Sequence, residues 1–186
     1  MTTPPWLTVL QDELDLEYGA RPRIAQLATV DERGRPRVRS VVCRRVLDDG
    51  SLVAASDGRS AKNAQVRSGA QTEWAFWLAG RRKQFRLGGP ARVVGADGDE
   101  ALREEVWRGL SDAARALFVW PAPGSPRGAC DVDFVQAVPA DVPMPASFEL
   151  VVTTPDEVEM LDLNPHPHKR GRWKKAEGWE REMLNP

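Results

Sequence analysis

Hydrophobic and polar positions alternate in short runs along most of the chain, and turn residues separate these runs. Residues 24–30 (IAQLATV) and 38–46 alternate on either side of the turn at 31–34, which predicts a β-hairpin. The run Gly88-Gly89-Pro90 predicts a bulge or a bend inside a longer strand. The same criteria predict further strands at residues 52–56, 72–78, 84–94, 148–153, 158–163, 170–174 and 179–184.

Helical spacing of hydrophobic residues occurs in fewer places. It extends from Pro4 to Gly19, and it recurs in residues 97–110 and 111–118. A short helix is expected at 60–66, with Ser60 as its N-cap. Residues 121–147 are dense in proline and glycine and are expected to form an ordered surface loop.

These elements form hairpins with few helices and no alternation of strand and helix. This order predicts a mostly β protein with an antiparallel barrel and peripheral helices. The sequence shows no internal repeat and no boundary in composition, so residues 1–186 are expected to form a single domain.

Charge and hydropathy exclude several kinds of partner. The net charge of the 186 residues is −1, which provides no general attraction to nucleic acid or to an anionic membrane surface. No apolar run approaches the roughly 20 residues that cross a bilayer, and residues 1–10 do not have the pattern of a signal peptide. We therefore expect a cytoplasmic protein with neither a nucleic-acid nor a membrane partner.

Cysteine and histidine are too few and too poorly placed for a metal site. Cys43 and Cys130 lie far apart and form no CxxC pair, which argues against a disulfide framework and a cysteine zinc site. Cys43 follows two valines and is expected to be buried. His166 and His168 lack a clear third ligand, whereas a metal needs three or four. We expect no metal.

Basic and hydroxyl residues form the main candidate site, since GxGxxG, GxxxxGK[ST], GxSxG and HExxH motifs are absent. Arg37 and Arg39 share one strand face, and Ser40 and Val42 share the other. Residues 56–62 (SDGRSAK) lead into the predicted short helix, whose N-terminal N–H groups favour a phosphate. Arg39, Ser60 and Lys62 would supply charge and donors. A capping serine and solvated arginines would produce the same pattern.

Two other residue types suit a planar ligand. Gln84 carries an amide donor and an acceptor, as the edge of a flavin or a nucleobase requires, although an exposed strand glutamine is the simpler interpretation. Trp107 and Trp120 flank predicted helices and could wall a cleft, although burial in a core is the usual place for tryptophan. Trp74 and Trp77 are expected in the core or in a dimer interface.

Taken in order along the chain, these segments resemble the pyridoxamine 5′-phosphate oxidase-like proteins. The resemblance lies in residues 39–44 (RSVVCR), 56–62, 82–86 (RKQFR) and 179–186 (WEREMLNP). Residues 110–127 and 155–163 further resemble a branch of pyridoxamine-phosphate-oxidase-related FMN-binding proteins first seen in cyanobacteria.

The resemblance implies a split β-barrel homodimer that holds FMN in two sites, each lined by both subunits. By resemblance, Arg39, Ser56, Ser60 and Lys62 would hold the FMN phosphate and ribityl chain. The backbone of Val41 and Val42 would face the isoalloxazine ring, Gln84 would reach its polar edge, and Arg44 would point toward a substrate phosphate. The implied cofactor-binding set is Arg39, Ser40, Val41, Val42, Arg44, Ser56, Ser60, Lys62 and Gln84.

Two departures from the oxidase pattern affect the expected substrate. Leu150 stands where the oxidase has tryptophan, and residues 160–164 lack the two arginines and the histidine of its late substrate-binding segment. Without these contacts a site discriminates against the substrate that they would bind. The leading hypothesis is therefore a flavin-dependent oxidoreductase with an unassigned small-molecule substrate. Authentic pyridoxamine/pyridoxine 5′-phosphate oxidase activity is one alternative, and a non-catalytic binder of FMN or another planar cofactor, such as haem or a deazaflavin, is another.

Overall fold

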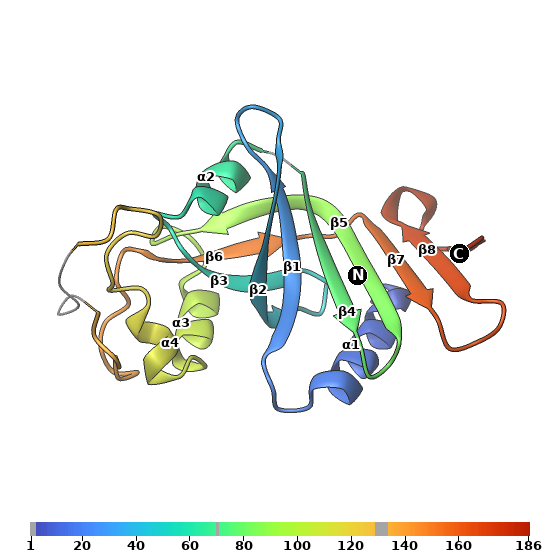
Figure 1. Ribbon diagram of the computed structural model, residues 1–186, viewed down its shortest axis with the longest axis horizontal. Coiled ribbons are helices and arrows are strands. Elements are labelled where there is room, and N and C mark those ends of the chain that lie inside the picture. Colours follow the sequence, from blue (N-terminus) through green and yellow to red (C-terminus); the bar gives the residue numbers. More distant parts are fainter. Residues whose placement is uncertain (1–2, 70, 129–133) are drawn as a thin grey trace.

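The computed structural model describes residues 3–69, 71–128 and 134–186, which form an antiparallel sheet flanked by helices (Figure 1). The strands are β1 (Arg23–Val30), β2 (Pro36–Val46), β3 (Leu52–Asp57), β4 (Gln71–Leu78), β5 (Lys83–Val94), β6 (Phe148–Thr153), β7 (Glu157–Asp162), β8 (Lys169–Lys174) and β9 (Arg181–Leu184). The helices are α1 (Pro5–Tyr18), α2 (Ala61–Arg67), α3 (Glu100–Arg108), α4 (Asp112–Ala116) and the 3-10 helix η1 (Lys175–Glu177).

Strand pairing closes a barrel of six strands. β1 pairs with β2 and β4, β3 pairs with β2 and β6, and β5 pairs with β4 and β6, all antiparallel. β7, β8 and β9 continue the sheet away from the barrel at one edge of β5, at the right of Figure 1. The expected mostly β split barrel with peripheral helices is confirmed.

β5 changes its neighbour at the predicted glycine-proline bend. One edge of β5 stays in register with β4 from Lys83 to Pro90. The other edge pairs with β7 up to Gly88 and with β6 from Ala91 onward. A Cβ on Gly89 would lie 2.3 Å from the carbonyl oxygen of Thr154, so only glycine fits there. At this bend β5 therefore changes its partner from β7, outside the barrel, to β6, within it. The predicted bulge is absent from the pairing of β5 with β4, which stays in register.

The barrel interior is filled by large apolar side chains. Trp74, Phe76 and Phe85 are fully buried inside, and Trp6 and Leu10 of α1 pack against the same cluster. Burial of the apolar surface of these side chains is the main contribution to the stability of the barrel.

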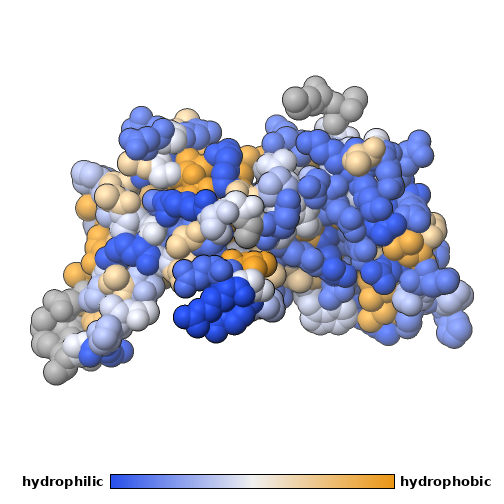
Figure 2. Space-filling model, turned by 90° about the horizontal axis from the view of Figure 1, so that it is seen from above, coloured by the Kyte–Doolittle hydropathy of each residue, from blue (hydrophilic) through white to orange (hydrophobic). Residues whose placement is uncertain are grey.

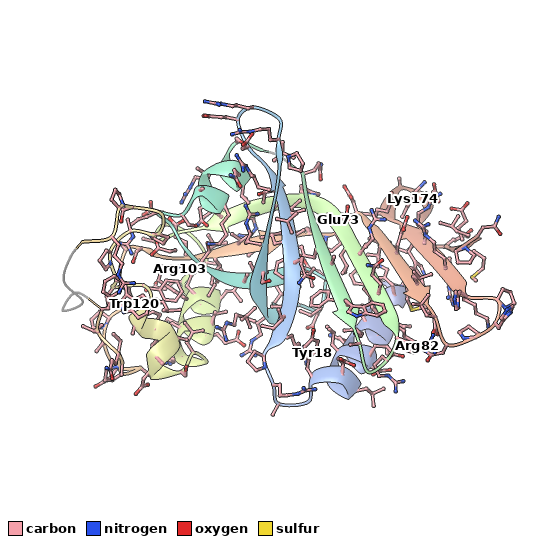
Figure 3. All side chains as sticks on the ribbon, in the orientation of Figure 1. Tyr18, Glu73, Arg82, Arg103, Trp120 and Lys174 are labelled. Carbon is pink, nitrogen blue, oxygen red and sulfur yellow. The ribbon has the colours of Figure 1, made fainter. Side chains whose placement is uncertain are left out.

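A second core lies on the other side of β6. Trp107 of α3 makes edge-to-face contacts with Phe118 and Phe148, with ring centroids 6.1 and 4.9 Å apart. Trp107 is thus 2% exposed, and it borders only a separate surface depression, together with Arg108 and Val142. Arg103 and Trp120 lie at this end of the molecule, and Lys174 lies toward the other (Figure 3).

Local caps explain where the predicted elements end. The Asp99 side chain accepts a hydrogen bond from the N–H of Leu102, so α3 begins at Glu100 rather than near 97. Gly178 and Trp179 have positive φ angles of 69° and 63°, and β9 therefore starts only at Arg181. Within 121–147, the described residues contain no helix or strand, as expected for a loop.

The outer face of the barrel carries exposed apolar side chains. Side chains directly paired across antiparallel strands point to the same face, and the register groups the outward residues of β1, β2, β4 and β5. Val38 is 65% exposed and Trp77 47% exposed, so Trp77 lies outside the core of the protomer. Figure 2 shows separate apolar patches on a largely polar surface. Among the described residues, no helix is both long and apolar enough to span a membrane.

Candidate functional site

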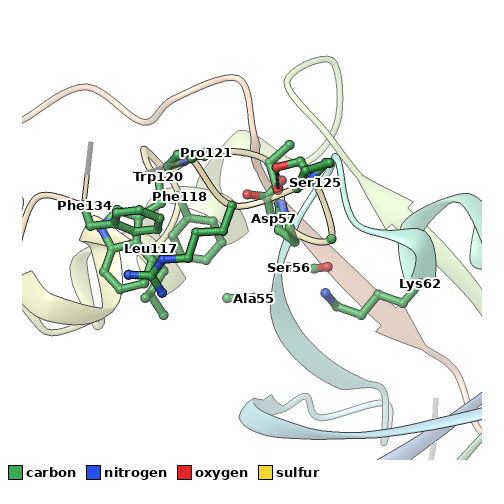
Figure 4. A pocket seen from close by; sticks show the side chains of 16 residues that line it. Ala55, Ser56, Asp57, Lys62, Leu117, Phe118, Trp120, Pro121, Ser125 and Phe134 are labelled. Atoms are coloured by element: carbon green, nitrogen blue, oxygen red, sulfur yellow. Dashed lines mark hydrogen bonds between the residues drawn. The ribbon is translucent and has the colours of Figure 1, made fainter. Parts of the chain in front are cut away.

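A cavity of about 500 Å³ lies between the barrel and the segment that follows α4 (Figure 4). Its polar wall is formed by Ser56 and Asp57 at the end of β3 and by Lys62 of α2. Its other wall is largely apolar and includes Leu117, Phe118, Trp120, Pro121, Pro123, Pro126 and Phe134. The predicted 56–62 segment thus borders a space large enough for a small molecule.

Lys62 and Ser60 are held together at the start of α2. The Lys62 Nζ donates a hydrogen bond of 2.9 Å to Ser60 Oγ, and Ser60 Oγ donates one of 2.7 Å to the carbonyl oxygen of Asp57. Burial, and after it the positive charge of Arg39, lowers the pKa of the Lys62 ammonium. The Lys62 and Arg39 cations therefore lie close enough to repel each other.

Arg39 is fixed by neutral acceptors on β1 and α2. Its Nη1 donates to Thr29 Oγ1 at 2.6 Å and to the Leu27 carbonyl at 3.1 Å, and its Nη2 donates to Gln65 Oε1 at 2.9 Å. Burial, and after it the charge of Arg37, lowers the pKa of Arg39. The guanidinium is thus oriented in advance beside α2, but no carboxylate of the described residues is ion-paired with it there.

Three of the predicted basic residues, Arg39, Arg44 and Lys62, have no carboxylate partner within the described part of the chain. Across residues 3–69, 71–128 and 134–186, no carboxylate oxygen lies within 4.0 Å of a side-chain nitrogen of Arg39, Arg44 or Lys62. In contrast, nearby Arg59 and Arg67 are paired with Asp57 and Glu149. A half-buried cation without a counterion is costly unless an anion binds to it.

Arg44 lies at an irregularity in β2. The pairing of β2 with β3 shifts register between Cys43 and Arg45, which places Arg44 at a β-bulge. Its Nε is buried without a hydrogen-bond partner in the described part of the chain, and burial lowers the pKa of its guanidinium. A bulge next to a binding cleft can aim a side chain out of the regular pleat, but Arg44 makes no hydrogen bond or ion pair with the described residues 56–62.

The remaining predicted residues lie on different surfaces. Val41 is buried in the barrel core, so only its backbone can face a ligand. Ser40, Val42 and Gln84 belong to the outer face of the barrel by strand register. Gln84 borders a separate depression with Arg86, Glu159 and Pro186. The protomer thus brings Arg39, Ser56, Ser60 and Lys62 together and leaves Gln84 apart.

Sequence reasoning missed most of the apolar wall and its attachment. Arg59 donates to both carboxylate oxygens of Asp57, at 2.9 and 2.6 Å, and to the Trp120 carbonyl at 2.9 Å. The Trp120 indole donates to the Val135 carbonyl at 2.7 Å. Trp120, one of the tryptophans considered for a cleft wall, does line the cavity. Arg59 therefore connects the basic segment to the opposite wall.

Nucleophilic and metal chemistry have no support in the described residues. Burial raises the pKa of the Cys43 thiol to about 12, which keeps it protonated and unreactive at neutral pH. The second cysteine, Cys130, lies outside the described residues. In the part of the chain that the structure covers, no three His, Cys, Asp or Glu side chains form a group able to hold a metal ion.

The donors fit a ligand that carries a phosphate. Arg39 and Lys62 offer two cations that make no ion pair with a carboxylate of the described residues, and the Ser60 hydroxyl lies against Lys62. Charge-assisted hydrogen bonds of this kind are the strong contacts of phosphate sites. α2, whose N-terminal N–H groups the sequence suggested as further donors, has seven residues.

The sequence matches known proteins over its whole length. Residues 3–95 match the family model of the pyridoxamine 5′-phosphate oxidase FMN-binding domain. The pyridoxine/pyridoxamine 5′-phosphate oxidase 2 of Arabidopsis thaliana is 26% identical over 198 aligned residues, which cover 98% of this chain and 97% of that protein.

Solved structures of other proteins have the same fold. A pyridoxamine 5′-phosphate oxidase-related, FMN-binding protein from Nostoc punctiforme superposes with a TM-score of 0.90 at 31% identity, and all of both chains is covered. PhzG from Burkholderia lata, solved with tetrahydrophenazine-1-carboxylic acid, has a TM-score of 0.82 at 20% identity over 100% of this chain and 94% of its own. At this low identity, the similarity to PhzG shows only that the two proteins share a fold. Fold, family-model match and full-length similarity together show that the chain belongs to the pyridoxamine 5′-phosphate oxidase family of FMN-binding domains.

Proposed function

We propose that this protein binds FMN and acts as a flavin-dependent oxidoreductase. The observation that carries the proposal is the pair of half-buried cations, Arg39 and Lys62, which have no ion-paired carboxylate among the described residues. Lys62 lines the cavity of about 500 Å³, and the charge of Arg39 lies close enough to lower the pKa of Lys62. The FMN-binding domain of the family model supports the choice of cofactor.

In this proposal the chain binds and orients the cofactor. Arg39 and Lys62 hold the phosphate with Ser60, and Ser56 lies beside the ribityl chain. The apolar side of the cavity, including Trp120, excludes water from the ligand. FMN supplies the redox chemistry when bound, and the protein supplies orientation and electrostatics.

We further propose a homodimer that completes each flavin site. Val42 and Gln84 share the outer barrel face with exposed Ile24, Val38 and Trp77. Trp77 is directly paired with Gln84. Contact through this face would bury exposed apolar area and would bring Gln84 of one protomer toward the cofactor of the other.

The substrate of the proposed enzyme is expected to differ from pyridoxamine phosphate. Leu150 is fully buried in the second core, and Met160 of β7 is also buried. Arg170, on the neighbouring strand β8, is ion-paired with Glu159. These positions therefore present no unpaired cation to a substrate phosphate.

Authentic pyridoxine/pyridoxamine 5′-phosphate oxidase activity is the second candidate. It is favoured by the name of the Arabidopsis relative, which aligns along nearly the full length of both proteins. Oxygen-dependent formation of pyridoxal phosphate by the flavin-loaded protein would establish it, and no turnover under these conditions would exclude it.

The proposal is tested on the purified protein. We expect flavin absorbance near ~450 nm, either on purification or after addition of FMN, because this band belongs to the cofactor. A protein that stays colourless and ignores FMN would refute it. Reduction of the bound flavin by NADH or NADPH would support an enzyme, whereas inertness to reductants would favour the non-catalytic binder.

A further inference from the structure

A buried polar chain runs from the cavity wall into the protein behind Ser56. Ser56 is 2% exposed and Asn63 is fully buried. The Ser56 hydroxyl donates a hydrogen bond to Asn63 Oδ1, and Asn63 Nδ2 donates one of 2.7 Å to Glu149 Oε2 on β6. Arg67 Nη2 contacts both oxygens of this carboxylate at 2.6 Å.

The carboxylate determines which way the Asn63 amide points. An ionised carboxylate only accepts hydrogen bonds, so the Asn63 NH₂ group must face Glu149. Its carbonyl oxygen then faces Ser56 and accepts the single hydroxyl proton of that residue. Ser56 is left with lone pairs, and no proton, for a ligand in the cavity.

The Ser60 hydroxyl, unlike that of Ser56, is not restricted to one acceptor. This hydroxyl has two alternative acceptors, the Asp57 carbonyl at 2.7 Å and Asn63 Oδ1 at 3.2 Å. It also accepts a hydrogen bond of 2.9 Å from the Lys62 ammonium. A hydroxyl proton that already has a choice of acceptors can turn toward an incoming anion. A phosphate requires donors, which Ser60, Lys62 and Arg39 provide and Ser56 does not.

We propose that Glu149 and Asn63 are positioning residues that fix Ser56 as a hydrogen-bond acceptor for a hydroxyl group of the ligand. The ligand is thereby selected as a phosphorylated polyol, with the anion at Arg39 and Lys62 and a chain hydroxyl at Ser56. The inference rests on the proposed binding of FMN, whose ribityl chain is such a polyol.

The glycine in the 56–62 segment agrees with this role for the carboxylate. A Cβ on Gly58 would lie 2.5 Å from Cδ of Glu149 and within 2.8 Å of both carboxylate oxygens. Gly58 therefore admits Glu149 beneath the segment. Gly58→Ala would displace the carboxylate without changing Ser56 or Asn63. It is therefore a second, independent way to perturb the hydrogen bonds that connect Glu149 through Asn63 to Ser56, which we call the relay.

The experiment combines FMN titrations with ³¹P NMR of bound FMN. We expect Ser56→Ala to weaken FMN by about 2- to 12-fold, the range for one neutral hydrogen bond, and to leave the ³¹P resonance unchanged. Ser60→Ala is expected to shift that resonance. Ser68→Ala, whose hydroxyl donates to the Gln65 carbonyl outside the cavity, is the matched control and changes neither quantity.

Double mutants test the relay itself. Glu149→Ala and Gly58→Ala are each expected to weaken FMN as Ser56→Ala does, and to add no further loss when combined with it, because they act through the same hydroxyl. Glu149→Gln retains an oxygen that accepts from Asn63 and is expected to restore binding.

Independent, additive losses would overturn the relay, because a merely structural role for Glu149 predicts additivity. A ³¹P shift in Ser56→Ala would assign Ser56 to the phosphate and would also overturn it. Unaltered FMN affinity in Ser56→Ala would do the same. Failure of the unmodified protein to bind FMN would instead remove the proposed function, so the two failures are distinguishable.

Discussion

Arg39→Gln is the substitution that best isolates the phosphate contact. The change removes the positive charge and the hydrogen bonds that the guanidinium donates to Thr29, Leu27 and Gln65, and it keeps a planar polar side chain. Thr29 and Gln65 also remain hydrogen-bonded to each other at 2.6 Å. The hydrogen bond between Thr29 and Gln65 does not depend on Arg39, so part of the surrounding network is retained.

The expected loss of affinity follows from the charge. A hydrogen bond to a charged group contributes about 1.5–3 kcal/mol, and its loss raises the Kd for FMN by about 10- to 150-fold. Without ligand, the substitution also removes the repulsion between Arg39 and Lys62 that lowers the pKa of Lys62. This relief opposes the loss of the Arg39 hydrogen bonds, so we expect the melting temperature of the FMN-free protein to change little.

Arg37→Gln provides the matched control. Arg37 lies two residues earlier on the same strand face, and its guanidinium is paired with Asp31 at 3.0 Å. Flavin fluorescence titration measures the Kd, and thermal unfolding without FMN measures stability. Arg39→Gln that binds FMN as tightly as the unmodified protein, or Arg37→Gln that loses equal affinity, would refute the placement of the phosphate.

Three further outcomes are expected. Trp77→Lys places a charge on the exposed barrel face and should convert a dimer to a monomer in light scattering; an unchanged mass would contradict the proposed interface. Asp31 should titrate at a pKa of about 2 by NMR: desolvation raises its pKa, but the hydrogen bonds that it accepts within the hairpin lower it by more. The contribution of Asp31 to stability is present above its ordinary pKa of 3.8 and is lost as the pH falls toward 2. Titration near 3.8 would contradict this expectation. In a Cys130→Ser background, Cys43 should resist thiol reagents at pH 8 until the protein unfolds, because burial raises its pKa to about 12, and rapid labelling of the folded protein would contradict this.

Much of the barrel could be predicted because its signals are local. Alternation in β1 corresponds to burial of Ala25 and Leu27 and to exposure of Ile24 and Val30. The turn residues between β1 and β2 sit in a hairpin held by Asp31, so the break in the pattern was a reliable boundary. The bend at Gly88–Pro90 was recognisable for the same reason.

The candidate site was predictable only in part. Ser56, Ser60 and Lys62 belong to one short segment, and strand alternation placed Arg39 correctly on the face opposite Ser40 and Val42. The link from Asn63 to Glu149 joins residues 86 positions apart, and no local pattern signals such a contact. The apolar cavity wall arises from the packing of the segment after α4, which a Pro- and Gly-rich composition alone does not specify.

Two of the tryptophan expectations show how tertiary packing decides between uses of one residue type. Both were expected beside helices, yet Trp107 lies within α3 and is 2% exposed in the second core, whereas Trp120 follows α4 and lines the cavity. The difference depends on the position of β6, whose Phe148 packs against Trp107. That strand lies about 40 residues further along the chain, beyond the reach of local pattern arguments.

A crystal structure of the protein with FMN tests the central claim most directly. We predict the FMN phosphate within hydrogen-bond distance, about 2.7–3.2 Å, of both the Arg39 guanidinium and the Lys62 ammonium. A phosphate bound away from these two cations would contradict the account, even if FMN occupied another part of the molecule.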